Sequence, residues 1–183
     1  FDAKGRPHRV PGMIPTPQGT LVRPHVHGAI NWAPPAYSPR TGLFYVAHWE
    51  HSGIMAVEGQ FPRAVGVNTR QTTMGDVNLE PFLNNEDEAR GVIRAYAPAT
   101  LRPVWEYPLG NITWGGTLST AGDVVFGGGK DGYFVALDAK TGKLLWKAAL
   151  GGQVNAGAMT YAVNGRQYVA IAAGTTLFTF ALP

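Results

Sequence analysis

The residues best suited to chemistry in this sequence begin with two close pairs of histidines. His25 and His27 are two residues apart, which on a strand places both side chains on one face, and His48 and His51 are three apart beside Glu50. Either pair offers imidazole nitrogens to a metal ion. Two ligands do not define a metal centre, and a solvent-facing or hydrogen-bonded histidine explains each pair as well. The sequence therefore predicts no metal site.

Two tryptophans lie in segments that suit a flat ligand. The segments Asn31-Trp32-Ala33-Pro34 and Thr113-Trp114-Gly115-Gly116 each precede a predicted strand. Glycine beside an aromatic ring lets the backbone approach a planar group closely. A planar cofactor against the ring and ordinary core packing both account for this pattern, and the spacing alone leaves the two open.

Other catalytic patterns do not occur in the sequence. The run Gly127-Gly128-Gly129-Lys130 lacks the spacing of a phosphate-binding P-loop and lies between predicted strands, without a helix behind it. There is no GxSxG nucleophile motif, no pair among the 12 carboxylates has a distinctive spacing, and there is no cysteine. Candidate acids and bases exist among the carboxylates, but the motifs and spacings single out no catalytic residue.

The composition indicates what kind of structure must position these residues. Of 183 residues, 24 are glycine and 14 are proline, 45% are apolar, and only 15% are charged. This balance is typical of many short strands joined by tight turns. No apolar run reaches the roughly 18 residues of a membrane span, and the N-terminus shows no leader pattern. The net charge of +3 is spread along the chain, which argues against nucleic-acid binding.

An internal repeat sharpens this prediction to a β-propeller. Residues 95–105 align without gaps on residues 136–146, so that Trp105 and Trp146 are 41 residues apart. A period of about 40 to 45 residues is that of a four-stranded propeller blade. Partial copies of the same pattern at residues 1–5 and 177–182 suggest that both ends of the chain fall inside a repeat.

Turn signals place the strands of the predicted antiparallel sheets. Asn164-Gly165 indicates a type I′ hairpin, and residues 129–132 indicate another turn. In the turn of residues 138–142 we expect the aspartate and threonine to cap and the glycine to take a left-handed conformation. Trp105 and Trp146 are then packing wedges between neighbouring blades. Residues 58–91 have few strand signals and are predicted to form a long excursion between two strands of one blade.

Together these segments resemble a known family. Residues 136–146 are similar to the tryptophan-docking repeat of quinoprotein propellers. Residues 31–46 and 114–126 resemble the PQQ-dependent alcohol dehydrogenases, the pyrroloquinoline quinone enzymes that include methanol and ethanol dehydrogenases. With residues 131–133 and 159–173 the likeness extends over nearly the whole chain outside residues 58–91. It implies that residues 1–183 are C-terminal blades of an eight-bladed propeller.

The resemblance also implies an activity and a setting. Family members oxidise primary alcohols by hydride transfer to PQQ, with Ca²⁺ or a lanthanide beside the quinone, in the periplasm, and pass electrons to an acceptor such as cytochrome c. A cation beside the reacting oxygen stabilises the charge that develops there. Asn31 and Trp114 fall on positions where the family places cofactor-contacting residues. Asn155, in the loop before the last predicted blade, is a further candidate for cofactor binding.

The chain departs from the family in what it lacks. The metal-binding glutamate and asparagine and the catalytic aspartate lie upstream of the matched region, so no residue here aligns with them. At most about four blades fit into 183 residues, so the ring needs further blades from the same polypeptide or from a second chain, such as another copy. The open set is expected to leave two edges that invite strand pairing. We expect the isolated chain to be inactive, and a non-catalytic propeller module for protein interaction or assembly is the alternative.

Overall fold

The computed structural model describes residues 2–8, 10–14, 16, 20–22, 24, 28–50, 53–55 and 90–181. All the regular secondary structure in these residues is β-strand, as the sequence predicts. No helix in the described part has the length and apolar character needed to cross a bilayer. The chain divides into two units, residues 1–28 with 51–88 and residues 29–50 with 89–183. In the first unit, β1 (Thr20–Val22) pairs antiparallel with β4 (Gly53–Met55).

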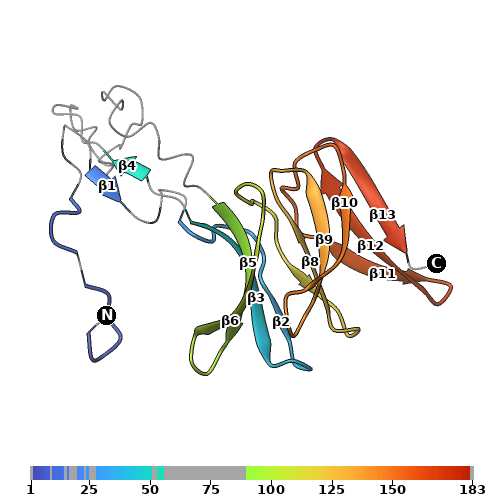
Figure 1. Cartoon of the computed structure of the whole chain (residues 1–183), viewed down its shortest axis with the longest axis horizontal. Helices are drawn as coiled ribbons and strands as arrows, with labels where there is room; N and C mark the ends of the chain where they lie inside the picture. The colour runs from blue at the N-terminus through green and yellow to red at the C-terminus, as the bar shows by residue number, and fades with distance from the viewer. Residues whose placement is uncertain are drawn as a thin grey trace, which may run out of the picture. The chain divides into compact units, whose positions relative to one another are not determined.

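The second unit contains three antiparallel sheets side by side (Figure 1). The first sheet has the order β2 (Ala36–Ser38), β3 (Leu43–Glu50), β5 (Arg90–Ala97) and β6 (Arg102–Pro108). The second has the order β7 (Leu118–Ser119), β8 (Val124–Gly128), β9 (Tyr133–Asp138) and β10 (Leu144–Ala149). The third has the order β11 (Met159–Val163), β12 (Arg166–Ala173) and β13 (Thr176–Ala181). Two sheets have the four strands of a complete blade.

The turns form where the sequence places them. Asn164 and Gly165 both have positive φ, 52° and 79°, as a type I′ hairpin requires. Gly132 donates to the carbonyl of Gly129 at 3.1 Å in the turn between β8 and β9. β3 pairs directly with β5, so that residues 51–89 connect two neighbouring strands of one sheet. Arg90 and Gly91, which the sequence predicts to lie in the excursion, belong to β5 instead, and residues 58–89 lie outside the described residues.

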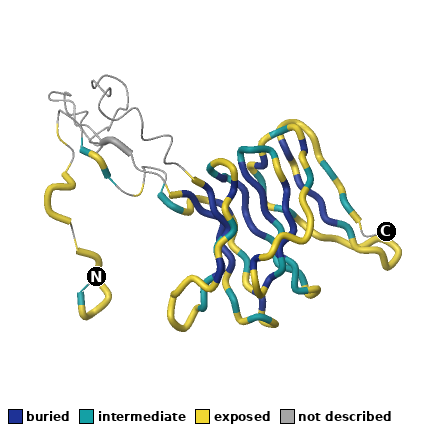
Figure 2. The backbone as a smooth tube through the Cα atoms, in the orientation of Figure 1, coloured by how far each residue is buried: buried dark blue, intermediate teal, exposed yellow. Residues whose placement is uncertain are grey.

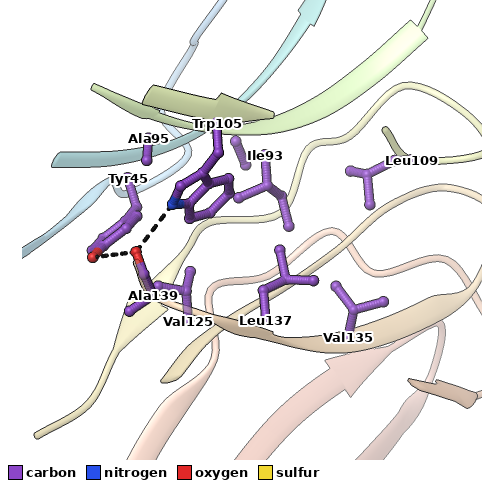
Figure 3. Close-up of a cluster of buried hydrophobic side chains, with 10 residues drawn as sticks. Tyr45, Ile93, Ala95, Trp105, Leu109, Val125, Val135, Leu137 and Ala139 are labelled. Atoms are coloured by element: carbon purple, nitrogen blue, oxygen red, sulfur yellow. Dashed lines mark hydrogen bonds between the residues drawn. The ribbon is translucent and has the colours of Figure 1, made fainter. Parts of the chain in front are cut away.

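The core between the first and second sheets is built around Trp105 (Figure 3). Its indole Nε1 donates to the carbonyl of Ala139 at 3.0 Å, and the hydroxyl of Tyr45 donates to the same oxygen at 3.0 Å. Gly142 lies against the ring, because a Cβ built there would be 2.6 Å from an indole carbon. The predicted wedge between blades is confirmed. In the preceding copy of this turn Leu101 takes the left-handed conformation itself, with φ of 55°.

A second core joins the second and third sheets. Phe134 on β9 lies 6.0 Å from Phe180 on β13, measured between ring centroids. Trp146 on β10 meets Phe180 edge to face at 4.9 Å and also contacts Phe134, so it too packs between sheets. Figure 2 shows the buried residues inside the three sheets and the exposed β11–β12 hairpin near the C-terminus.

The end of this set of blades is a sheet face. On the far side of the third sheet, Met159, Tyr161 and Leu177 share one face through the register of β11, β12 and β13, and Leu177 is 71% exposed. The opposite side of the first sheet has an open apolar groove of about 490 Å³ lined by Ile30, Tyr37, Phe44, Val46, Tyr96, Pro98 and Leu101. Because the sheets pack face to face, a further blade would cover these faces. The expected pairing through strand edges stays a prediction.

Candidate functional site

Three segments, each leading into the first strand of a sheet, converge on Pro34. They are residues 29–35 before β2, residues 109–117 before β7 and residues 150–158 before β11, and we call them the convergent segments. The carbonyl of Pro34 accepts a hydrogen bond from the Thr117 amide at 2.9 Å. A Cβ built on Gly116 would be 2.5 Å from the Pro34 ring, and one on Gly157 would be 2.9 Å from it. Glycine at both positions therefore lets the three segments meet.

The convergent segments occupy equivalent places in their sheets. Pro34, Gly116 and Gly157 each stand two residues before the first strand, and they meet in space. Two residues earlier stand Trp32, Trp114 and Asn155 in the same three sheets. Two of the three predicted cofactor-binding residues, Trp114 and Asn155, thus share an equivalent position, and the third, Asn31, is one residue before Trp32.

The backbone on both sides of Trp114 is firmly held. Thr113 is buried, and its Oγ1 donates to the carbonyl of Gly128 at 2.6 Å while accepting from the Gly115 amide at 3.0 Å. The Ile112 carbonyl accepts from the Lys130 amide at 3.0 Å. Gly115 faces main-chain carbonyl oxygens so closely that a Cβ there would lie within 3.2–3.3 Å of three of them. A well-fixed backbone gives the indole a defined position.

The Trp114 ring is partly buried and packs against a second indole, that of Trp49 on β3. The ring centroids are 4.6 Å apart with an interplanar angle of 55°. Trp32 differs, since its side chain is 61% exposed. The sequence left two explanations for these tryptophans, a flat ligand or packing in the core. Core packing does not describe the exposed Trp32. Trp114 packs against Trp49 and is also partly exposed.

Asn31 and Asn155 are both exposed and are attached to residues that are fixed. Asn31 comes two residues after Ala29, whose carbonyl accepts a hydrogen bond from the Trp49 amide at 3.0 Å. Asn155 lies between Val154 and Ala156, whose carbonyl oxygens both approach Gly115, the neighbour of Trp114. The structure therefore brings together the segments of all three predicted residues, and their role as cofactor ligands stays a prediction.

The histidines form no metal centre in the described part of the chain. Among those residues no group of three histidine, aspartate or glutamate side chains is placed to hold an ion. His48 is only 6% exposed, and its Nε2 has no hydrogen-bond partner within the described residues. Burial, and then the Arg94 guanidinium, lower the pKa of His48 to about 4, so the imidazole is neutral at pH 7. His25, His27 and His51 lie outside the described residues.

A four-residue ion cluster stands beside His48 on the first sheet. Arg94 Nη2 contacts Glu50 Oε1 at 2.8 Å and also bonds to Glu106. Arg90 contacts Glu50 at 2.7 Å and Glu106 at 3.4 Å. Hydrogen bonds from Arg94 and Arg90 lower the pKa of Glu50 to about 2. Because the two carboxylates are already paired with the two guanidinium groups, the cluster is suited to holding β3, β5 and β6 together rather than to acid or base catalysis.

Sequence reasoning missed Trp49 and the ion cluster. The signal for Trp49 was available, since it continues the alternation of Tyr45 and Ala47, which point into the core between the first two sheets. The ion cluster joins residues separated by up to 56 positions, from Glu50 to Glu106, and no local pattern marks it.

The antiparallel four-stranded sheets pack face to face, and the segments before their first strands meet in one region. This arrangement is that of a β-propeller, and the chain forms some of its blades. The family model described as PQQ, glucose/ethanol/alcohol dehydrogenase, beta-propeller domain, matches residues 85–169. Residues 85–169 therefore belong to the propeller domain of this quinoprotein dehydrogenase family, as the resemblance found in the sequence predicts.

Individual relatives agree with this assignment. A quinohemoprotein alcohol dehydrogenase of Pseudomonas putida is 37% identical over 160 residues, which cover 84% of this chain and 22% of that protein. A quinoprotein ethanol dehydrogenase of Pseudomonas aeruginosa is 36% identical, covering 84% of this chain and 23% of its own length. The chain spans about a quarter of the length of these curated relatives.

Solved structures show the same fold. The structure of a quinohemoprotein alcohol dehydrogenase from Pseudomonas putida matches with a TM-score of 0.74 and 33% identity, over 87% of this chain and 24% of that one. A europium-containing methanol dehydrogenase matches with a TM-score of 0.71 and 28% identity, over 93% of this chain and 30% of that one. The predicted propeller fold is confirmed.

Proposed function

We propose that this chain is the C-terminal portion of a PQQ-dependent alcohol dehydrogenase and supplies propeller blades and one part of the PQQ pocket. The observation that carries the proposal is the convergence of the segments bearing Asn31, Trp114 and Asn155, with Trp114 held between a fixed backbone and Trp49. The complete protein would oxidise primary alcohols in the periplasm and pass electrons to an acceptor such as cytochrome c.

The residues present fit PQQ by their chemistry. PQQ is a planar, aromatic and strongly anionic molecule with many hydrogen-bond acceptors, and when bound it supplies a quinone that takes up a hydride. A fixed, partly exposed indole such as Trp114 offers a flat apolar surface to such a ring. The amide groups of Asn31 and Asn155 supply N–H donors for its oxygens. This chain would thus bind and orient the cofactor through these three residues.

The remaining parts of the active site would come from elsewhere in the polypeptide. The described residues contain no cluster suited to Ca²⁺ or a lanthanide, and by the family resemblance the metal ligands and the catalytic base precede the matched region. The europium in the methanol dehydrogenase structure belongs to that protein. We therefore expect the isolated chain to bind PQQ weakly and to oxidise no alcohol.

A direct test combines binding with turnover. The purified chain is dialysed to equilibrium against PQQ, with and without Ca²⁺, and is then assayed for dye reduction with ethanol. We expect saturable PQQ binding that is weakened when Trp114 is replaced by phenylalanine and unchanged by Trp146→Phe, whose indole lies between the second and third sheets. The absence of binding by the wild-type chain would refute the pocket assignment. Dye reduction by the isolated chain would refute our placement of the catalytic groups outside it.

A second candidate function is a non-catalytic module for interaction or assembly. It is favoured by the exposed apolar face of the third sheet, where Met159, Tyr161 and Leu177 lie together. The blades that cover this face would come from the same polypeptide or from a second copy of the chain. Native mass spectrometry distinguishes these cases, because a second copy predicts a concentration-dependent oligomer, and a stable monomer that binds PQQ would exclude the module as the main role.

A further inference from the structure

We propose that Trp49 is a positioning residue for the cofactor, holding both the Trp114 indole and the segment of Asn31 in place. The inference rests on the proposed function and deepens it, since it assigns the geometry of the pocket to a residue that need not contact PQQ. Trp49 is next to last in β3 and is only 4% exposed.

The first contact of Trp49 is with Trp114. The centroids of the Trp49 and Trp114 indole rings are 4.6 Å apart. Aromatic pairs at this separation prefer defined tilted arrangements over a free range of orientations. Trp114 is anchored through Thr113 and Gly115 on its main chain, but neither of these holds the ring itself. Trp49 therefore supports the Trp114 ring directly, in addition to the hold on its main chain.

The residue opposite Trp49 makes this contact possible. Trp49 pairs with Gly91 on β5, and a Cβ on Gly91 would collide with the carbonyl oxygen of Asn111 and come within 3.1 Å of Ile112. The Gly91 carbonyl accepts from the Leu109 amide at 2.9 Å. The absence of a side chain at Gly91 lets residues 109–112 lie directly on β5. This close approach carries Trp114 onto the ring of Trp49.

The second contact of Trp49 is through its main chain. Its amide donates to the carbonyl of Ala29 at 3.0 Å, two residues before Asn31. This bond ties the first convergent segment to the end of β3, the same strand end that supports Trp114. A shift of Trp49 would therefore move two of the three predicted cofactor residues together. We infer that replacing its side chain lowers PQQ affinity without removing any group that binds PQQ.

Two variants test this inference from opposite sides. Trp49→Phe shrinks the supporting ring, and Gly91→Ala leaves both indoles intact but pushes residues 111 and 112 away from β5. We expect each variant to weaken PQQ binding about 2- to 10-fold in equilibrium dialysis, the range expected for loss of one aromatic pair. Trp146→Phe is the matched control and should bind as the wild type does.

Circular dichroism supplies a second readout. Two indoles this close couple and give an exciton couplet, which Trp49→Phe and Trp114→Phe should abolish, Gly91→Ala should weaken and Trp146→Phe should leave unchanged. A purely structural role would lower the melting temperature of the variants while the folded protein kept wild-type affinity, and that result would overturn the inference alone. Failure of the wild-type chain to bind PQQ would refute the proposed function and this inference with it.

Discussion

Substitution of Gly142 by alanine tests how the blades are joined. Gly142 has a φ of 71°, and a Cβ placed there would be 2.6, 2.7 and 3.1 Å from three atoms of the Trp105 indole. The alanine would therefore strain the backbone of the turn and push the indole away from it. We expect the interface between the first and second sheets to loosen, because Trp105 lies at its centre.

The magnitude follows from two contributions. A non-glycine residue in the left-handed region costs about 1–2 kcal/mol. Displacing the indole also removes the hydrogen bond from Nε1 to the carbonyl of Ala139, which is worth about 1–2 kcal/mol when the partners are buried. We therefore expect Gly142→Ala to lower the free energy of unfolding by about 2–4 kcal/mol, measured by urea denaturation.

The repeat provides a matched control in Leu101, which stands at the same place in the preceding copy. Leu101 has a φ of 55° and is 77% exposed, so glycine there relieves backbone strain and removes almost no packing. Leu101→Gly should leave the stability unchanged or raise it by up to about 1 kcal/mol. If Gly142→Ala cost less than about 0.5 kcal/mol, or if both substitutions had the same effect, the packing of Trp105 on Gly142 would not stabilise the interface as we argue.

Two further predictions concern the charged side of the first sheet. Burial holds the pKa of His48 at about 4, below the ordinary 6.5, so between these values the unfolded chain binds a proton that the folded chain does not. The free energy of unfolding should therefore fall by about 1–3 kcal/mol as the pH drops from 6.5 to 4. Urea denaturation at a series of pH values measures this dependence, and His48→Leu should flatten it between pH 4 and 6.5. An unchanged slope of the unfolding free energy against pH would contradict the assignment. Arg94→Met leaves Glu50 and Glu106 without their less exposed partner and should lower the free energy of unfolding by about 1–2 kcal/mol in the same assay at pH 7. Arg90→Met removes a more exposed guanidinium and should lower it by less than about 1 kcal/mol. Equal losses of stability would argue against a central role for Arg94.

The parts of the fold that the sequence predicts are those encoded locally or by repetition. Asn164-Gly165 specifies its hairpin because both residues tolerate positive φ, and the structure shows both there. Trp105 is recognisable as a wedge because Trp146 repeats it 41 residues later, in each case after the turn of the blade. Repetition also explains the left-handed conformation of Leu101, which its residue type disfavours. Leu101 occupies the position that Gly142 holds in the next copy of the turn, and the turn imposes its conformation there.

The parts that the sequence did not predict depend on contacts between distant segments. Gly91 has no local signature, because its importance comes from the approach of Asn111 and Ile112, which follow it by 20 positions and more. His48 is recognisable as a candidate metal ligand but not as a buried neutral imidazole, because its burial is created by β5 and its charged neighbours. How the blades pack likewise depends on which face of each sheet is buried. The local strand signals do not specify that face.

Repetition also separates packing from function within the site. Pro34, Gly116 and Gly157 hold equivalent positions and perform one task, the close meeting of the convergent segments. Two residues before them, the equivalent positions hold Trp32, Trp114 and Asn155, which differ in size, polarity and exposure. Equivalent positions that hold different side chains, on segments that meet at Pro34, are suited to binding an asymmetric ligand, because each blade offers a different group. Positions that serve packing are more uniform, as Trp105 and Trp146 are between the sheets and Gly116 and Gly157 are against Pro34.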